Sequence, residues 1–82
     1  MSDVPTIKEL VAALGGVTHL SKELGIDYFR VDQWTRRDNI NEQHLWPIYQ
    51  LCRKKRIQVR GQTIGAVLLL RIIYEARKRK AA

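Results

Sequence analysis

Apolar residues recur along the first half of the chain at the three- and four-residue spacing of amphipathic helices. The pattern predicts a helix over about residues 5–14, which a glycine pair then interrupts, and a second short helix over about 17–24. Gly25 can adopt the left-handed conformation that commonly ends a helix, and Asp27 is a suitable N-cap for a third helix over 27–35. Two short helices joined by a tight glycine-containing turn have the local geometry of a helix-turn-helix.

A small residue and several apolar anchors occupy the positions that the crossing of these two helices requires. Ser21, four residues before Gly25, places a small side chain where the second and third helices would approach each other. Val31 and Trp34, three residues apart, are expected to anchor the third helix in the core. The joint placement of Ser21, Gly25, Ile26 and Val31 in one short window supports the helix-turn-helix prediction more than any one of them does.

The second half of the chain predicts a fourth helix and a longer final helix. The fourth covers about residues 45–55, with Pro47 inside its first turn. Residues 56–60 alternate polar and apolar side chains, which predicts a short strand or an extended link. Thr63 can cap the final helix, predicted over 62–80. We therefore expect a single domain with an all-α fold: a compact helix-turn-helix bundle of four short helices plus a longer C-terminal helix.

The final helix carries apolar residues on two sides. One side holds Leu68, Leu69, Ile72, Ile73 and Ala76, and another holds Val67, Leu70 and Tyr74. An ordinary surface helix has one apolar stripe, and a chain of 82 residues buries only roughly 60% of its unfolded surface. We expect this helix to complete the core and to pair with a second copy in a homodimer, through Leu69, Leu70, Ile73 and Tyr74. The alternative is full burial of the helix within one chain.

The chain is strongly basic, and the excess charge is unevenly placed. It holds 15 Lys and Arg against 8 Asp and Glu, for a net charge of +7. The whole excess lies beyond residue 50, within residues 51–60 and 71–80. Clustered bases of this kind are typical of a protein with a polyanionic partner. The alternative is a solvated surface with charges at helix ends.

Localisation is predicted from what the sequence lacks. Cys52 is the single cysteine, so the chain forms no internal disulfide, in keeping with a reducing compartment. The longest apolar run, residues 64–70, is far shorter than the roughly 20 residues of a membrane span. The first residues, with Asp3 and Pro5, lack the basic-then-apolar order of a secretory signal. We expect a protein of the bacterial cytoplasm or nucleoid without a membrane partner.

Few residues suggest enzymatic chemistry. His19 and His44 are isolated, and Cys52 has no histidine or cysteine at metal-ligand spacing. The sequence has no P-loop, no dinucleotide-binding glycine signature and no nucleophile motif. We expect no enzymatic activity, no metal, no cofactor and no small-molecule ligand, and we interpret both histidines as surface residues of helices.

Two stretches of the chain resemble the Cro and Cro-like repressor family of phage helix-turn-helix proteins. Residues 14–26, Leu-Gly-Gly-Val-Thr-His-Leu-Ser-Lys-Glu-Leu-Gly-Ile, are similar to the opening of the family's motif. Residues 40–49, Ile-Asn-Glu-Gln-His-Leu-Trp-Pro-Ile-Tyr, resemble the start of the fourth helix in Cro-like prophage regulators. Together the similarity covers roughly residues 7–55. It implies a compact all-α bundle whose helix after the turn enters the major groove.

The resemblance also implies which side chains would contact DNA. The base-contacting positions fall on Tyr28, Phe29, Asp32 and Gln33, with Asp27 and Arg30 at the edges. The chain departs from the family's pattern in two ways. Ser21 stands where alanine is commoner, and the third helix carries two acids and Phe29 in place of polar amides. These departures bear on the DNA sequence that would be bound more than on the fold.

The side chains of the third helix can perform this chemistry. Gln33 can pair bidentately with adenine, and Asp32 can accept a hydrogen bond from a cytosine amino group. Tyr28 can reach a phosphate through its hydroxyl, and Phe29 can pack on a thymine methyl group. Two alternatives stay open: Phe29 folds back onto the core, and Asp32 forms an ion pair with Arg36.

Residues outside the base-reading positions, all but one of them basic, are expected to contact the phosphate backbone. The expected backbone set is Asp27, Arg30, Arg36, Arg37, Arg53, Lys54, Lys55 and Arg56. Each phosphate that is neutralised releases counterions, so binding would depend strongly on salt. For residues 53–56 the alternative is a favourable interaction with the dipole of the fourth helix.

The sequence thus predicts a sequence-specific regulator of transcription that binds double-stranded DNA as a dimeric Cro-like repressor and reads the major groove with residues 27–35. One alternative is a nucleoid-type architectural protein that binds DNA without strict choice of sequence. Another is a protein-interaction module, such as the antitoxin half of a pair, whose final helix binds a different polypeptide.

Overall fold

Helices form most of this fold, which confirms the all-α prediction. The computed structural model describes residues 4–81, with only the backbone of Lys80 and Ala81. Within that part of the chain the elements run in the order α1 (Ile7–Ala13), α2 (Gly16–Leu24), α3 (Tyr28–Arg37), the 3-10 turn η1 (Glu42–His44), α4 (Leu45–Lys54), β1 (Gln58–Val59), β2 (Gln62–Thr63) and α5 (Ala66–Ala81). Asp3, used above against a secretory signal, lies outside the described residues.

The helix ends follow from caps that the sequence supplies. The hydroxyl of Thr6 accepts a hydrogen bond from the backbone N–H of Glu9 (3.2 Å), and the carboxylate of Asp27 accepts one from that of Phe29 (3.0 Å). Gly25 ends α2 in the left-handed conformation, with φ 68°. A side-chain oxygen at an N-cap satisfies a backbone donor of the first turn that has no partner within the helix. The predicted turn between α2 and α3 is therefore present.

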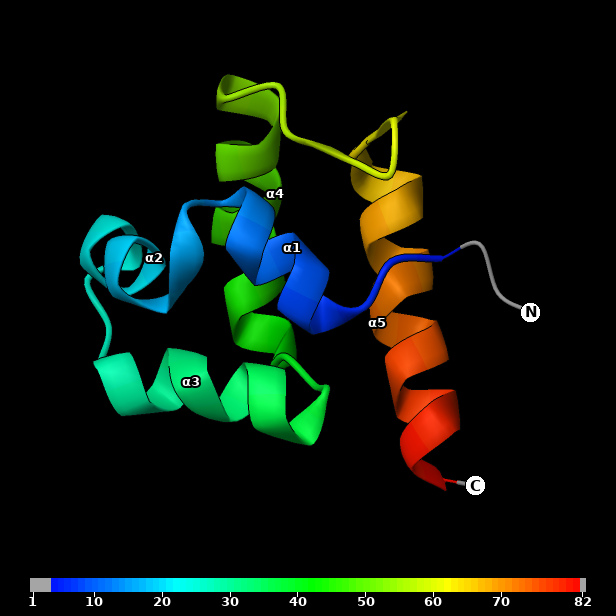
Figure 1. Ribbon diagram of the computed structural model, residues 1–82, viewed down its shortest axis with the longest axis horizontal. Helices are drawn as coiled ribbons and strands as arrows, with labels where there is room; N and C mark the ends of the chain where they lie inside the picture. Colours follow the sequence, from blue (N-terminus) through cyan, green and yellow to red (C-terminus); the bar gives the residue numbers. More distant parts are fainter. Residues whose placement is uncertain (1–3, 82) are drawn as a thin grey trace.

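The core lies where α1, α2 and α3 meet α4 and α5. Figure 1 shows α3 across one end of the molecule and α1 and α2 beside it; α4 runs away from that end, and α5 runs back toward it. The largest fully buried side chains come from nearly every element: Ile7, Leu10, Leu20, Ile40, Ile48, Ile64 and Ile72. Val31 and Trp34 are buried and fix the inner face of α3, as predicted. Among the described residues, no helix is both long enough and apolar enough to cross a membrane.

A small hairpin replaces part of the predicted final helix. Gln58 pairs with Thr63, and Val59 with Gln62, in an antiparallel register. The two residues between the strands, Arg60 and Gly61, both have positive φ (54° and 76°), as in the type I′ turns that join such strands. The extended segment near residues 56–60 is thus confirmed, but Thr63 as a helix cap is wrong because it belongs to β2. The helix begins three residues later.

Candidate nucleic-acid interface

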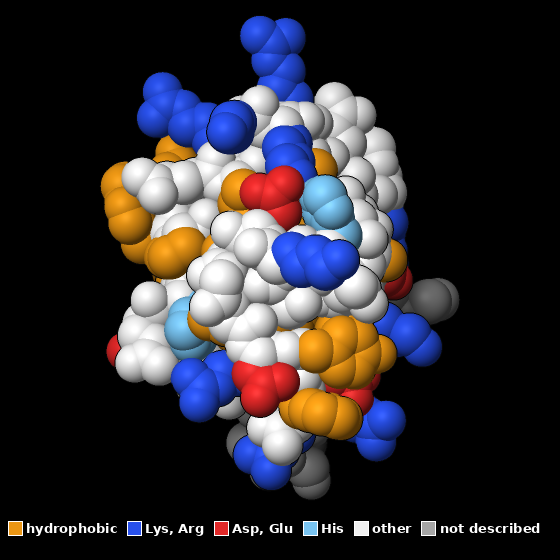
Figure 2. Space-filling model, turned by 90° about the vertical axis from the view of Figure 1, so that its left-hand side faces the viewer, with side chains coloured by type: hydrophobic (Ala, Val, Ile, Leu, Met, Phe, Trp, Pro, Cys, Tyr) orange, Lys and Arg blue, Asp and Glu red, His pale blue; other side chains and the backbone are white. Residues whose placement is uncertain are grey.

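The outer face of α3 is largely exposed. Tyr28 is 45% exposed and Phe29 70% exposed, so the alternative in which Phe29 folds back onto the core is wrong. Their rings contact each other edge to face, with centroids 5.7 Å apart. Because Val31 and Trp34 hold the opposite side of the helix in the core, this face is directed outward. Figure 2 shows the side of the molecule that carries α2 and the start of α3, where exposed hydrophobic side chains lie among charged ones.

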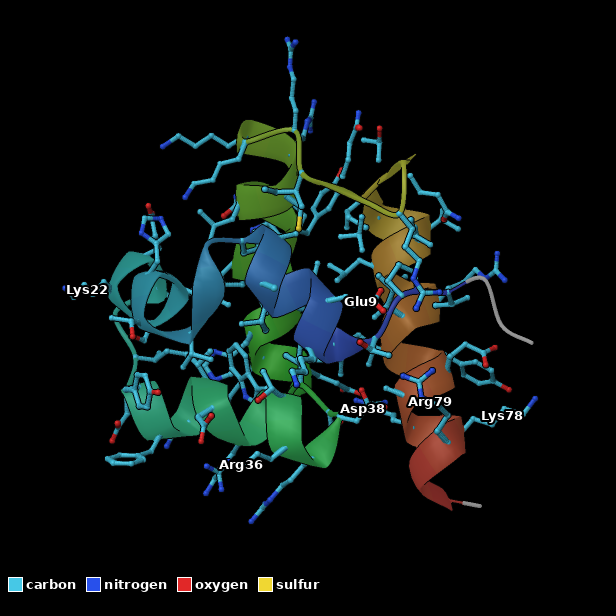
Figure 3. All side chains as sticks on the ribbon, in the orientation of Figure 1. Glu9, Lys22, Arg36, Asp38, Lys78 and Arg79 are labelled. Atoms are coloured by element: carbon cyan, nitrogen blue, oxygen red, sulfur yellow. The ribbon has the colours of Figure 1, made fainter. Side chains whose placement is uncertain are left out.

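The polar residues of α3 adjoin this aromatic pair. Phe29, Asp32, Gln33, Arg36 and Arg37 line one shallow hollow on the surface of the helix. Arg36 Nε lies 2.8 Å from a carboxylate oxygen of Asp32, so the predicted alternative of an ion pair one helical turn apart is present. Figure 3 shows Arg36 projecting from α3 away from the rest of the fold. The residues expected to contact bases are therefore brought together on one surface, with Asp32 already engaged by a cation.

A second, more polar hollow lies where α3 ends. It is lined by Arg30, Gln33, Trp34, Arg37, Asn39, Asn41 and Gln43. The last three residues were missed by sequence reasoning. Asp38, with φ 53°, turns the chain back beneath the end of α3 and so places the asparagines beside the arginines. The signal that could have found them is the polar character of residues 38, 39 and 41–43 directly after the third helix, which only the buried Ile40 interrupts.

Trp34 anchors this second hollow from inside. Its indole Nε1 and the side-chain oxygen of Asn39 are buried and have no hydrogen-bond partner within residues 4–81. The ring of His44 lies over Trp34, with centroids 5.2 Å apart. His44 is therefore half-buried against the core, whereas His19 is exposed; the surface interpretation holds fully for His19 only.

The basic cluster at the end of α4 does not join the α3 surface. Arg53, Lys54, Lys55 and Arg56 lie at the end of the molecule opposite α3 (Figure 1). In Figure 2 the Lys and Arg side chains at the top of the view mark this end. The expectation that residues 53–56 continue the phosphate-binding set of Arg36 and Arg37 is therefore not supported for one straight duplex, because α4 runs away from α3.

Lys55 is also engaged within the protein. Its ammonium nitrogen lies 3.1 Å from a carboxylate oxygen of Glu23 and 3.1 Å from His19 Nε2, which ties the end of α4 to α2. The hydrogen bond from Lys55, and then its charge, lower the pKa of the Glu23 carboxyl below its ordinary value. His19 Nε2 in turn lies 3.3 Å from Glu23.

The two apolar sides of α5 are confirmed, and they have different surroundings. Leu69 and Ile73 are only 2% and 3% exposed within this single chain, so both belong to its own core. Leu70 and Tyr74 are 59% and 65% exposed. Of the four residues expected at a dimer contact, only these two remain available on the surface.

Trp46 extends this exposed apolar surface onto α4. The side chain is 64% exposed, and its ring lies 5.6 Å from that of Tyr49. Together with Leu45, Leu69 and Leu70, the two aromatic residues line a groove between α4 and α5. Sequence reasoning missed Trp46. An aromatic residue beside a proline in the first turn of a helix has few ways to point into the core, so its exposure could have been predicted.

No group of three or more His, Cys, Asp or Glu side chains within residues 4–81 is arranged to hold a metal ion. Cys52 is fully buried, and burial raises the pKa of its thiol to about 11, which keeps it protonated.

No family model, curated protein or solved structure matches the chain. The resemblance to Cro-like repressors therefore stays a prediction from the residues quoted above.

Proposed function

We propose that the protein is a sequence-specific regulator of transcription that binds double-stranded DNA by inserting α3 into the major groove, as a homodimeric repressor of the Cro-like kind in the cytoplasm. The observation that carries this proposal is the outward face of α3. Six of its ten residues are exposed on one helix whose other side is fixed by Val31 and Trp34: Tyr28, Phe29, Arg30, Gln33, Arg36 and Arg37.

The size and chemistry of this face suit the major groove. A helix of ten residues is about 15 Å long, and the groove, about 12 Å wide, admits a helix. Gln33 offers the paired donor and acceptor that match adenine, and Phe29 offers an apolar contact for a thymine methyl group. Asp32 shares its carboxylate with Arg36, which lessens the repulsion between that acid and the phosphates.

The hollow at the end of α3 supports the same proposal. Arg30 and Arg37 form no ion pair with a described residue, and three amide side chains, Asn39, Asn41 and Gln43, lie beside them. Arginine and amide groups are the usual partners of DNA phosphates, which position a recognition helix without reading sequence.

Homodimerisation is proposed through the exposed side of α5. Leu70, Tyr74 and Val67 (75% exposed) form an apolar face that continues onto Trp46 of α4. A contiguous exposed apolar surface of this kind marks an interaction site more often than a solvated one. A two-fold axis at this face would pair two α3 helices for a palindromic DNA site.

The test is selection of DNA from a random duplex library, followed by affinity measurement on the selected site and on a scrambled one. We expect a palindromic consensus and a preference of roughly 10³-fold or more for the selected site. The matched control is the Phe29→Ala, Gln33→Ala double variant, which keeps every basic residue and should lose that preference. Enrichment of no consensus, with equal affinity for all duplexes, would reject sequence-specific regulation and favour the architectural alternative.

A further inference from the structure

The basic cluster at the end of α4 is a concentration of positive charge that the α3 site leaves unused. We call Arg53, Lys54, Lys55 and Arg56 the α4-end surface. All four side chains are exposed, and they belong to the last turn of α4 and the two residues that follow it; the end of α4 lies at the top of Figure 3. Lys55 is held by Glu23, whereas Arg53, Lys54 and Arg56 form no ion pair with a residue in the described range. Arg53 and Arg56 therefore remain uncompensated at this end of the molecule, and Lys54 interacts with Glu23 through its charge alone, without a direct ion pair.

The backbone directs Arg56 into this surface at a conformational cost. The N–H of Ile57 donates to the carbonyl of Cys52 (2.9 Å) and that of Arg56 to the carbonyl of Arg53 (3.4 Å), the hydrogen bonds of a Schellman helix end. Arg56 occupies the position that requires a left-handed residue, with φ 50°. Glycine is the common residue there because a Cβ atom is strained in that conformation. An arginine at a position that favours glycine points to a use for its side chain.

The neighbouring residues suit nucleic acid better than a membrane. Gln58, Gln62 and Thr63 of the adjoining hairpin are exposed and polar, and such side chains contribute to phosphate contacts beside arginine and lysine. None of the large exposed apolar residues of the described chain lies within residues 53–63. A surface segment that binds a bilayer needs an apolar face as well as bases.

We infer that the α4-end surface binds the phosphate backbone of a second DNA duplex. The domain measures 33 × 25 × 19 Å, and this surface lies at the end opposite the exposed face of α3 (Figure 1). A straight duplex seated on α3 therefore does not reach residues 53–56, and the duplex that they contact is a different segment. The chain would bridge two segments of DNA, one read by α3 and one held without regard to sequence. The bridging role, though not the surface itself, rests on the function proposed for α3.

The first experiment maps the two surfaces separately by NMR. The full chain, labelled with ¹⁵N, is titrated with a random-sequence duplex of about one helical turn at low salt. We expect amide shifts at Arg53–Gln58 as well as along α3, and both sets should weaken as salt rises. Shifts along α3 alone would overturn the inference and leave the proposed function intact. Shifts at residues 53–58 alone would contradict the proposed function and leave the second surface intact.

A vesicle titration separates the two kinds of anionic partner. Vesicles of phosphatidylcholine with about one third phosphatidylserine are added to the same labelled chain. We expect no selective loss of signal at residues 53–58. A response of these residues to vesicles, together with none to duplex, would overturn the inference in favour of a membrane surface.

The second experiment tests bridging with charge variants. Duplex immobilised on beads captures a labelled free duplex only when the protein holds both. The Arg53→Gln, Lys54→Gln double variant should reduce this capture several-fold. For the second duplex it should also lower the slope of log K against log salt by about 1.8, because each of the two lost phosphate contacts contributes about 0.9. The matched control is Arg71→Gln, Lys78→Gln, which removes two exposed helical cations elsewhere. Equal capture by both variants, as expected when a dimer bridges through its two α3 helices, would overturn the inference.

Arg56→Gly separates binding from folding. Glycine relieves the left-handed strain, so the variant should unfold at an equal or higher urea concentration than the natural chain. Capture of the second duplex should nevertheless fall. Unchanged capture by this variant, or lower stability of the Arg53→Gln, Lys54→Gln variant with full capture, would assign these residues to the helix end alone and reject the second surface.

Discussion

The guanidinium of Arg79 on α5 forms an ion pair with the carboxylate of Asp38 at the end of α3. Its Nη2 and Nε lie 2.8 and 3.0 Å from one carboxylate oxygen of Asp38 (Figure 3). The other carboxylate oxygen accepts a hydrogen bond from the backbone N–H of Ile7 at 3.4 Å. The Asp38 side chain thus joins the end of the proposed recognition helix to the start of α1 and to the final helix.

This junction should contribute measurably to the stability of the fold. A double-mutant cycle with Asp38→Asn and Arg79→Gln removes the charge pair, while asparagine still tolerates the left-handed conformation of residue 38. We expect a coupling of about 0.5–1 kcal/mol in the free energy of unfolding, because both side chains are partly exposed. Urea denaturation of the four proteins measures it. Additive effects of the two substitutions would show that the Asp38–Arg79 pair itself does not contribute to stability.

Gln33 should discriminate between DNA sequences without governing overall affinity. Gln33→Ala is expected to weaken binding to the selected site by about 1–3 kcal/mol and to leave binding to random duplex nearly unchanged. Arg37→Gln is the contrast, because loss of a phosphate contact should weaken both complexes alike. Fluorescence anisotropy on the two duplexes measures the difference. Equal losses for Gln33→Ala on both would exclude a base contact.

An aspartate substitution should have different effects on the two sides of α5. Leu70→Asp places a carboxylate on the exposed side, so the chain should remain folded, with a change in stability within about 0.5 kcal/mol for the monomer. If a second copy covers this side, the variant should sediment as a monomer and bind a palindromic site weakly. Ile73→Asp should unfold the chain, because its side chain lies in the core. A natural chain that is already monomeric at micromolar concentration, and binds one copy per site, would contradict the dimer.

Acid should destabilise the fold through two glutamates. A hydrogen bond from Arg60 lowers the pKa of the Glu9 carboxyl, and one from Lys55 lowers that of Glu23. The unfolded chain therefore binds protons more readily, so this stabilisation is complete well above pH 4.5 and is lost as the pH falls through the lowered values. The urea midpoint should drop between pH 7 and pH 3. The Glu9→Gln, Glu23→Gln variant should show a smaller drop, and an identical drop would assign acid sensitivity to other groups.

Local features of the fold were predictable from sequence, and long-range placement was not. Asp27 and Gly25 marked the turn because caps and left-handed residues act on their own neighbours. The two sides of α5 followed from helical periodicity alone. The prediction of Thr63 as a helix cap was wrong because a two-residue strand has too little alternation to be recognised. A threonine before an apolar run also resembles a cap.

The candidate site shows the same division. The resemblance to Cro-like repressors implied Tyr28, Phe29, Asp32 and Gln33 as base contacts, and all four lie on one predicted helix. The position of residues 53–56 relative to α3 depends on the direction in which α4 leaves the loop after Asp38, which no local pattern encodes. The polar hollow with Asn39 and Asn41 went unseen for the same reason.

The Asp38–Arg79 junction fixes the position of α3 relative to α5. In the proposed dimer this helix carries Leu70 and Tyr74 at the two-fold axis and, five residues after Tyr74, the arginine that holds the end of α3. No flexible joint then separates the dimer axis from either reading helix. The spacing between half-sites becomes a fixed property of the protein, and each base pair added between them would turn one half-site by roughly a tenth of a helical turn away from a partner that has no means of following it.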